Sequence, residues 1–285
     1  MKKYKLTEET LEIYGCTLHR IVALRDFGDV RKGNIGGWIE DEDNLSHDDD
    51  CWVYDDAKVY GNAKVYGNAE VLGDAEVYGD AEVLGDAEVY GDAEVYGDAE
   101  VLGNAKVLGD AEVYDDAKVY GNAKVYGNAK VLGNAEVYGD AKVYGNAKVL
   151  GNAKVLGNAE VLGNAKVLGN AKVYGNAKVL GNAEVYGDAE VYGDAEVLGN
   201  AEVYGNAKVY GNAKVEKKSD YIVFKNWWSS GRYFTWTRSN DKWKVGCFYG
   251  TGEELIKKAY NDSEEKGREY ERVVKYVESI KSEIK

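Results

Sequence analysis

"VYGNAKVYGNAEVLGDAEVYGD", residues 59–80, shows the pattern that decides the fold. Its six-residue word reads Val, Tyr or Leu, Gly, Asn or Asp, Ala, and Lys or Glu, and 27 words follow one another without insertion over residues 53–215. Repetition at a fixed period indicates a solenoid. A period of six does not suit a lone amphipathic helix, and a turn signal in every word excludes one long strand. Each word therefore predicts a short strand and a corner, with Val and Ala pointing inward and both neighbours of Val pointing outward.

The corner of each word holds Gly followed by Asn or Asp. Asp replaces Gly at positions 55 and 115, whereas the next position is always Asn or Asp within the repeat. Asn and Asp tolerate a left-handed backbone better than other residues with a side chain. We therefore expect the left-handed residue to be Asn62 and its equivalents, with Gly giving room beside it.

The repeat resembles the hexapeptide-repeat family, whose members form left-handed parallel β-helices of triangular section. This resemblance covers residues 53–215 and implies a turn of three words, or 18 residues, and the hand of the coil. Spacing alone does not give the hand, since ordinary parallel crossovers are right-handed. With one degenerate coil at residues 35–52, we predict about ten coils and a rod of about 48 Å.

The segment before the repeat is expected to close one end of the rod, because an open solenoid end exposes edge strands and core. Residues 1–34 form this predicted cap, with strands at residues 4–6, 11–14 and 17–24. In the degenerate coil, the six-residue register places Ile39, Leu45 and Cys51 on Ala sites. The same register places Ile35 and His47 on Val sites.

The segment after the repeat, residues 216–285, is predicted to be a small α+β module. Strands are expected at residues 221–228, 233–237 and 243–249. Thr251 and Glu254 have the spacing of a capping box, which predicts a helix over residues 252–260. A second helix is expected over residues 265–284, with Tyr270, Val273, Val274, Val277 and Ile280 on its apolar face. The predicted fold is thus an all-β solenoid (residues 35–215) between an N-terminal β cap and a C-terminal α+β module.

Both ends resemble those of hexapeptide-repeat proteins of phages and prophages. The resemblance is carried by "ALRDFGDVRKGNIGGWIEDEDNLS" (residues 23–46) at the head, and by "GCFYGTGEEL" (246–255) followed by "KGREY" (266–270) in the tail. It implies a phage or prophage origin and brings no assigned chemistry. The expected location is the bacterial cytoplasm or a virion.

Composition narrows the classes of function. The formal net charge of −14 disfavours direct nucleic-acid binding over the whole surface. Three widely spaced cysteines, an odd number, favour a reducing compartment over a disulfide framework. No apolar run is long enough for a secretion signal or a membrane span, so no membrane partner is expected.

Catalysis is the less favoured interpretation of this chain. Some left-handed β-helices are acyltransferases, and some bind zinc through histidines in clefts between subunits. Here only His19 and His47 are present, both before the regular coils, and no loop interrupts the words to shape a pocket. We therefore expect no catalytic residue, no metal site and no cofactor.

The outward positions carry two patterns. An 18-residue turn stacks tyrosines in columns, such as Tyr60, Tyr78, Tyr96 and Tyr114, which we interpret first as self-stacking. A ring platform for sugar or a partner, and a seam between copies in a homo-oligomer, are the alternatives. Charges are banded: residues 70–116 hold 15 acids and one base, residues 118–178 hold nine lysines and three acids, and residues 184–202 hold six acids. Duplication of words explains the bands, and docking of a partner is the alternative.

Four of the six tryptophans lie in the C-terminal module. Trp with Arg is typical of binding hot spots, so we expect Trp228, Arg232 and Trp236 to contribute to a contact surface. Trp227 and Trp243 are expected in the core. The favoured function is a non-enzymatic spacer that binds a protein partner through this module. The alternatives are an acidic inhibitor that imitates nucleic acid and an acyltransferase-like enzyme.

Overall fold

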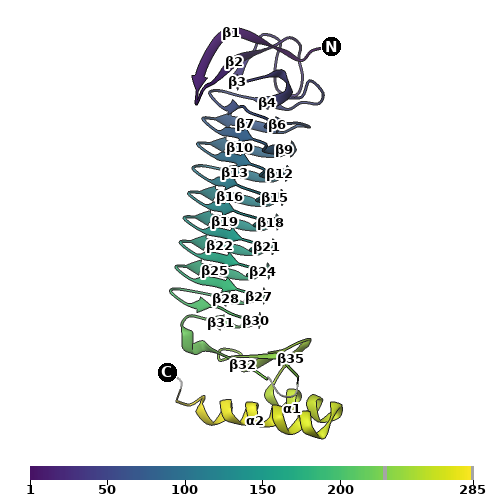
Figure 1. Cartoon of the computed structure of the whole chain (residues 1–285), viewed down its shortest axis with the longest axis vertical. Helices are drawn as coiled ribbons and strands as arrows, with labels where there is room; N and C mark the ends of the chain where they lie inside the picture. The colour runs from purple at the N-terminus through teal and green to yellow at the C-terminus, as the bar shows by residue number, and fades with distance from the viewer. Residues whose placement is uncertain (227–229, 284–285) are drawn as a thin grey trace.

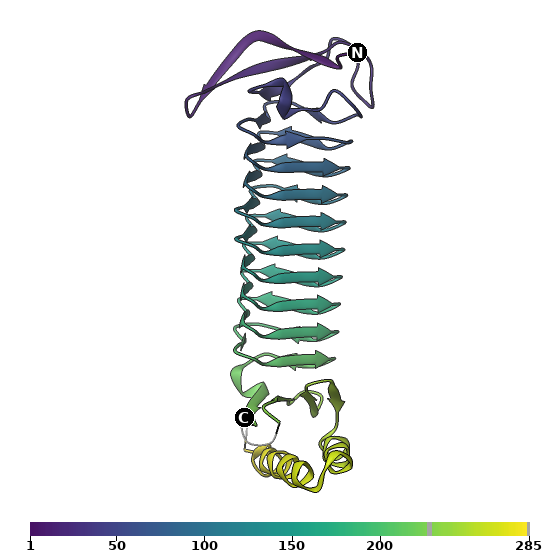
Figure 2. The same ribbon diagram turned by 45° about the vertical axis from the view of Figure 1, so that its right-hand side comes forward.

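The computed structural model describes residues 1–226 and 230–283, and it is a rod with a different small structure at each end (Figures 1 and 2). The rod is a parallel β-solenoid of about ten turns, as predicted. Each turn contributes one strand to each of three sheets. At one strand spacing per turn, the solenoid is about 48 Å long.

The three sheets run along the whole rod. The first sheet contains β3 (Ile35–Ile39), β5 (Lys58–Val59), β8 (Glu76–Gly79), β11 (Glu94–Gly97), β14 (Glu112–Tyr114), β17 (Lys130–Leu132), β20 (Lys148–Gly151), β23 (Lys166–Gly169), β26 (Glu184–Gly187) and β29 (Glu202–Val203). The second contains β4 (Trp52–Val53), β7 (Glu70–Gly73), β10 (Glu88–Gly91), β13 (Lys106–Leu108), β16 (Lys124–Gly127), β19 (Lys142–Gly145), β22 (Glu160–Gly163), β25 (Lys178–Gly181), β28 (Glu196–Val197) and β31 (Lys214–Val215). The third contains β6 (Lys64–Val65), β9 (Glu82–Gly85), β12 (Glu100–Gly103), β15 (Lys118–Gly121), β18 (Glu136–Gly139), β21 (Lys154–Gly157), β24 (Lys172–Gly175), β27 (Glu190–Gly193) and β30 (Lys208–Gly211).

Every strand pairs with the strand one turn away, so that like residues lie side by side. Val89 pairs with Val107, and its neighbour Glu88 pairs with Lys106. The Val and Ala of every word are fully buried, and the residues on either side of Val face outward. The core is therefore a column of small aliphatic side chains, which matches the predicted inward and outward positions.

The prediction for the corner residue is wrong. Gly, and not the Asn or Asp after it, has the left-handed conformation: φ is +69° at Gly61 and +75° at Gly109. Where Asp replaces Gly, Asp55 and Asp115 adopt φ of +50° and +60°. The two Asp residues made the Gly position look as if it did not need a positive φ, but Asp is one of the few residues that can replace Gly in this conformation.

The Asn and Asp side chains have a different role at the corners. From Asn62 to Asn182, each corner Asn amide donates a hydrogen bond to the Asn or Asp one turn further along, as from Asn146 Nδ2 to Asn164 Oδ1 (2.9 Å) and from Asn170 Nδ2 to Asp188 Oδ1 (3.0 Å). The donors point toward the C-terminal end in every such pair. A short side chain that carries an oxygen acceptor is therefore required at this position.

The N-terminal cap is a long hairpin that continues the first sheet. β1 (Tyr4–Ile13) and β2 (Cys16–Ala23) pair antiparallel, and β2 pairs antiparallel with β3. The predicted strands at residues 4–6 and 11–14 thus form one strand, with an irregularity between Leu6 and Thr10. In both views the hairpin reaches sideways from the end of the rod (Figures 1 and 2).

The predicted register of the degenerate coil is partly wrong. Ile39 pairs with Val59 and Leu45 with Val65, at separations of 20 residues, so both occupy Val sites and not Ala sites. From Trp52 onward the separation is 18, since Trp52 pairs with Glu70. Two surplus residues therefore lie between Leu45 and Trp52. Consequently Ile35, predicted to point inward, is 66% exposed.

The first coil is closed by side chains that imitate a missing turn. The Asn44 amide donates to the carbonyl oxygens of Gly61 and Ala63, both at 2.9 Å. The Glu40 carboxylate accepts from the main-chain N–H of Gly61 at 2.7 Å. A 3₁₀ helix, Glu42–Asn44, with its own capping box holds the Asn44 side chain in place. These bonds satisfy main-chain groups that would otherwise be left unpaired.

The C-terminal module follows a 3₁₀ helix, Lys218–Asp220, and combines an antiparallel sheet with two helices. Its strands are β32 (Tyr221–Lys225), β33 (Tyr233–Thr237), β34 (Lys242–Val245) and β35 (Phe248–Gly250), in that order across the sheet. The third predicted strand is split in two, because Gly246 turns the chain with φ of +54°. The predicted helices are present as α1 (Gly252–Asp262), with the capping box at Thr251 and Glu254, and α2 (Glu264–Ile280). None of the helices in the described part of the chain is long and apolar enough to cross a membrane.

Replacing Val131 by Asp is expected to lower the free energy of unfolding by more than about 3 kcal/mol, because a carboxylate would lie unpaired in the Val and Ala core. The matched control, Leu132→Asp, puts the same group on the outward neighbour and should cost far less. Chemical denaturation of both variants measures the difference. Equal losses would contradict the assignment of inward and outward positions.

Candidate functional site

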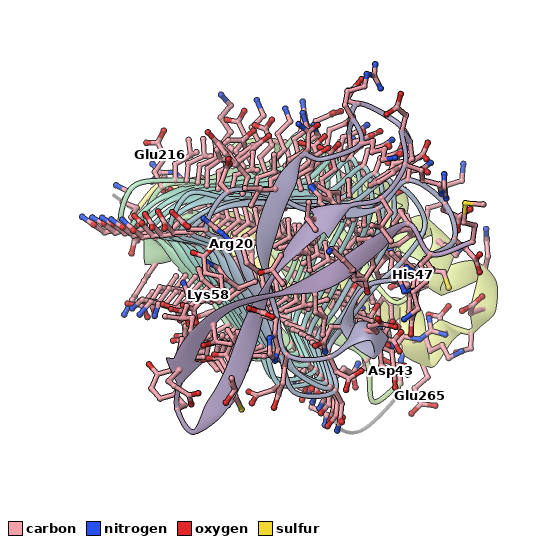
Figure 3. All side chains as sticks on the ribbon, turned by 90° about the horizontal axis from the view of Figure 1, so that it is seen from above. Arg20, Asp43, His47, Lys58, Glu216 and Glu265 are labelled. Carbon is pink, nitrogen blue, oxygen red and sulfur yellow. The ribbon has the colours of Figure 1, made fainter. Side chains whose placement is uncertain are left out.

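The rod surface consists of columns of like side chains. Figure 3, which looks down the axis, shows the outward side chains superimposed in rows around the coils. In the column of the first sheet, Tyr60, Tyr78, Tyr96 and Tyr114 stack with centroid distances of 5.0, 4.8 and 4.5 Å and nearly parallel rings. The predicted self-stacking is therefore present.

Opposite charges pair at several places along the rod. Lys106 contacts Glu88 at 2.7 Å on the second sheet, and Lys130 contacts Glu112 at 2.6 Å on the first sheet. Inside the acidic band like charges lie one strand apart: Glu94 lies between Glu76 and Glu112. Burial, together with these two carboxylates, raises the pKa of Glu94 above its usual value. Like charges therefore face each other inside the acidic band, whereas Lys106 in that band, and Glu136 and Glu160 in the lysine band, each pair with an opposite charge one turn away.

The two histidines serve the N-terminal cap. His47 Nδ1 accepts from the main-chain N–H of Lys3 at 3.2 Å, and its ring lies 4.3 Å from the ring of Tyr4. His47 Nε2 lies 3.5 Å from a Glu42 carboxylate oxygen. His19 Nδ1 lies 3.2 Å from the carbonyl oxygen of Thr7. Across residues 1–226 and 230–283, no group of three or more His, Cys, Asp or Glu side chains is arranged to hold a metal ion.

An open groove of about 690 Å³ lies beside the first coil at this end, and most of its lining is acidic. Several of its polar groups already have partners within the cap. Asn44 and Glu40 bond the main chain of the first coil, and Asp80 accepts from the amide of Asn62 at 2.9 Å. The groove therefore follows from the way in which the cap closes the rod.

The module docks on the last coil through hydroxyl groups. In the regular coils, the N–H of each Lys or Glu donates to an Ala carbonyl of the next turn, as from Glu190 to Ala207. In the last coil, the N–H of Lys208 donates instead to Thr235 Oγ1 at 2.9 Å, and that of Lys214 donates to Ser239 Oγ at 2.6 Å. The Tyr249 hydroxyl donates to the carbonyl of Tyr210 at 3.0 Å. The sheet of the module thus replaces the missing eleventh turn on two sides of the rod.

A polar cluster strengthens this junction. One oxygen of Glu190 accepts from the hydroxyls of Tyr174 (3.0 Å) and Tyr210 (2.5 Å), and the other contacts Lys208 Nζ at 2.8 Å. Burial opposes the charge of Glu190, but Lys208 and the two phenols outweigh it and hold its pKa below the usual value. Lys244 of the module lies over the Tyr210 ring at 4.4 Å, and burial, together with the charge of Lys208, lowers the pKa of Lys244. Within this cluster, Lys244 belongs to the module and contacts the rod through the ring of Tyr210.

The structure separates the residues of the predicted contact surface. Trp236 is only 2% exposed, and its indole N–H donates to Asp241 at 2.7 Å, so the prediction of a surface position for Trp236 is wrong. Alternation on β33 turns this ring toward the helices, where it joins the core with Trp243, as predicted for Trp243. Arg232 is exposed, next to the turn at Gly246. Trp227 and Trp228 lie outside the described residues.

A different surface of the module exposes aromatic and aliphatic side chains. Tyr276 on α2 is 54% exposed and meets the ring of Phe224 on β32 edge to face at 5.9 Å. Val273, Arg272 and Glu269 complete an open hollow of about 480 Å³. The amphipathic pattern of α2 does not predict this surface, because Tyr276 lies outside the apolar face of the helix. The sequence did contain a signal for this surface, namely an aromatic residue, Tyr276, beside the apolar face of the helix.

The rod, its caps and the repeated word define a hexapeptide-repeat β-solenoid. No protein-family model matches the chain. The chain is similar to the "Uncharacterized acetyltransferase YdcK" of Escherichia coli (strain K12), with 37% identity over 62 residues. That match covers 19% of this chain and 19% of the relative, so the similarity spans about a fifth of each protein.

Replacing Thr235 by Val keeps the shape of the side chain and removes the acceptor for the buried N–H of Lys208. We expect a loss of about 1–3 kcal/mol in the stability of the junction. Hydrogen exchange at the Lys208 amide measures it, and exchange should accelerate. Thr235→Ser is the control, since it keeps the hydroxyl. Unchanged protection in the Val variant would show that the hydroxyl does not cap the rod.

Glu94→Gln is expected to raise the melting temperature at neutral pH. The folded state raises the pKa of this carboxyl, so protonated Glu94 favours folding below the ordinary pKa of about 4.5, and this contribution is lost as pH rises through the raised pKa. The advantage of the Gln variant should therefore shrink toward zero as the pH is lowered. Thermal unfolding between pH 4 and pH 8 tests this expectation.

Glu136→Gln is the control with the opposite expected sign, because Glu136 contacts Lys154 at 2.7 Å. A stabilising effect of the same size in both variants would show that net charge, and not the position of Glu94, is responsible.

Proposed function

We propose that the chain is a non-enzymatic rod of phage or prophage origin, which binds a protein partner through its C-terminal module. The solenoid would hold the module about 48 Å from the cap. The proposed location is the bacterial cytoplasm or a virion. The partner remains a protein of host or phage, and a seam between copies is a further use of the tyrosine columns.

The observation that carries this proposal is the surface formed by Phe224, Val273, Tyr276 and Arg272. It combines a half-exposed aromatic ring, an aliphatic side chain and an arginine whose side chain is 73% exposed. Aromatic residues and arginine are enriched at binding hot spots, where they fill pockets on a partner. The hollow beside Tyr276 offers space for one side chain of the partner.

The rest of the rod also supports a protein in which the solenoid is a spacer and the module binds the partner. Its faces repeat the same word, so a partner on the rod would have several equivalent registers, whereas each end has a unique structure. Arg232 is exposed on the module, and Trp228 remains a proposed contributor to the contact surface. The hydroxyls of Thr235 and Ser239, and the contact of Lys244 with the Tyr210 ring, hold the module on the rod, as a spacer requires.

The name of the E. coli relative favours an acyltransferase as the second candidate. Incubation with acetyl coenzyme A and a panel of amines and alcohols tests it, with free coenzyme A as the readout. Turnover above the background of a heat-denatured sample would support the enzyme. Its absence would leave the spacer as the better account.

Tyr276→Ala should weaken partner binding by about 2 kcal/mol, the usual cost of removing a hot-spot ring. A photo-crosslinking amino acid at position 276 identifies the partner, and the Ala variant is then compared with the wild type by titration. Tyr90→Ala is the matched control, since Tyr90 is an equally exposed ring on the rod. A folded Tyr276→Ala protein that binds with wild-type affinity would contradict the proposal.

A further inference from the structure

The last coil is covered unevenly by the module. Main-chain N–H groups of two of its strands, β30 and β31, donate to the hydroxyls of Thr235 and Ser239. The amide of Asn240 donates to Asn212 Oδ1, at the next corner, at 3.3 Å. The remaining corner consists of Tyr204, Gly205 and Asn206, and we call it the open corner. A Cβ atom added at Gly205 would meet no atom within 4 Å, whereas at most other rod corners it would touch the next turn.

The open corner keeps the groups that bind the next turn elsewhere in the rod. The ring of Tyr204 stacks on Tyr186 on one side (5.3 Å, 12°), but on the other side it meets Tyr221 only edge-on (6.4 Å, 80°) and stays 45% exposed. In the described part of the chain, the Asn206 amide has no hydrogen-bond partner, and neither has its main-chain N–H. The corresponding N–H of Asp188 donates to the carbonyl of Gly205 at 2.9 Å.

A cleft of about 470 Å³ lies beneath this corner. Its walls are Tyr204 and Asn206 on the rod, and Tyr221, Ile222, Val223 and Tyr233 on the module. β32 is the edge strand of the module's sheet, with β33 on one side and no described strand on the other. Lys218, also at the cleft, is paired with Glu202 at 3.0 Å. The cleft is therefore an aromatic slot whose lining includes the unpaired Asn206.

We infer that this cleft binds an extended peptide in which an aromatic residue is followed, two residues later, by Asn or Asp. The peptide takes the place of the missing word of the solenoid. Its ring stacks on Tyr204, and its Asn or Asp oxygen accepts from the Asn206 amide. The carbonyl of the residue between them accepts from the Asn206 N–H. Addition of a segment to an open sheet edge is an established mode of peptide recognition.

The direction of the amide ladder gives this site a specificity that a hydrophobic slot lacks. Along the rod, the amide bonds between corner residues donate toward the C-terminal end, as from Asn182 Nδ2 to Asn200 Oδ1 at 2.9 Å. In the column of the open corner, Asp188 accepts from Asn170 and has no donor to pass on, so the unpaired amide of Asn206 is free to donate to the Asn or Asp of the peptide. A folded second copy of this chain does not supply such a segment, because its words are paired inside its own solenoid. The site also differs from the Phe224 and Tyr276 surface, so each can fail without the other.

The test uses the full chain and three fluorescent hexapeptides, VYGNAK, VYGDAK and VAGNAK, with fluorescence polarisation as the readout. We expect saturable binding of the first two and binding of VAGNAK about fivefold weaker, since a stacked ring pair contributes about 1 kcal/mol. Tyr204→Ala should weaken VYGNAK by a similar factor, and Tyr204→Phe should not. Tyr90→Ala, which removes a ring from mid-rod, should leave binding unchanged.

Replacing Asn206 by Asp distinguishes this proposal from a general affinity for aromatic peptides. Asn206→Asp should still bind VYGNAK, whose amide can donate back to the new carboxylate, but should lose VYGDAK because two carboxylates would face each other. Asn128→Asp, at a mid-rod corner, is the control and should bind both peptides. Equal binding of all three peptides, no saturation at millimolar peptide, or binding of maltoheptaose in place of the peptides would each overturn the proposal.

Discussion

The ladder that joins each word to the word 18 residues later is the interaction on which the whole molecule depends. It places identical residues next to each other: Val packs on Val in the core, Asn bonds to Asn at the corner, and tyrosine rings stack on the outer surface. The Val and Ala core alone is thin, so main-chain hydrogen bonds, ring stacking and amide pairs must add to it. The same alignment puts Glu94 between two carboxylates, and that repulsion is the cost of repetition.

Both ends solve the same problem with different chemistry. A parallel strand leaves N–H and C=O groups unpaired on its outer edge. At the head, Asn44 and Glu40 replace the missing turn with an amide and a carboxylate. At the tail, two hydroxyls do so at two strands, and the open corner is left without a cover. The unique chemistry of the protein is therefore concentrated where the repetition stops.

The six-residue pattern was enough to predict a solenoid of short strands and its buried positions, because every word repeats the same physical requirement, whereas the turn of three words came from the resemblance to the hexapeptide-repeat family. It did not reveal which corner residue is left-handed, since Asp at 55 and 115 obscured the role of Gly. The two surplus residues before Trp52 could not be located either, because the irregular words there fit two registers. Trp236 was assigned to the surface because composition alone does not say which face of a strand meets the helices.

Identical words also make neighbouring registers nearly equal in energy within the rod. A coil that slipped by one turn would pair with the same Val, Gly and Asn positions as before. The surplus residues between Leu45 and Trp52 break this equivalence, since they fit only beside the cap. The cap therefore fixes the register in which all the following coils stack. A gene that gains or loses 18 codons changes the length by about 4.8 Å and leaves both ends intact, so length can evolve separately from binding.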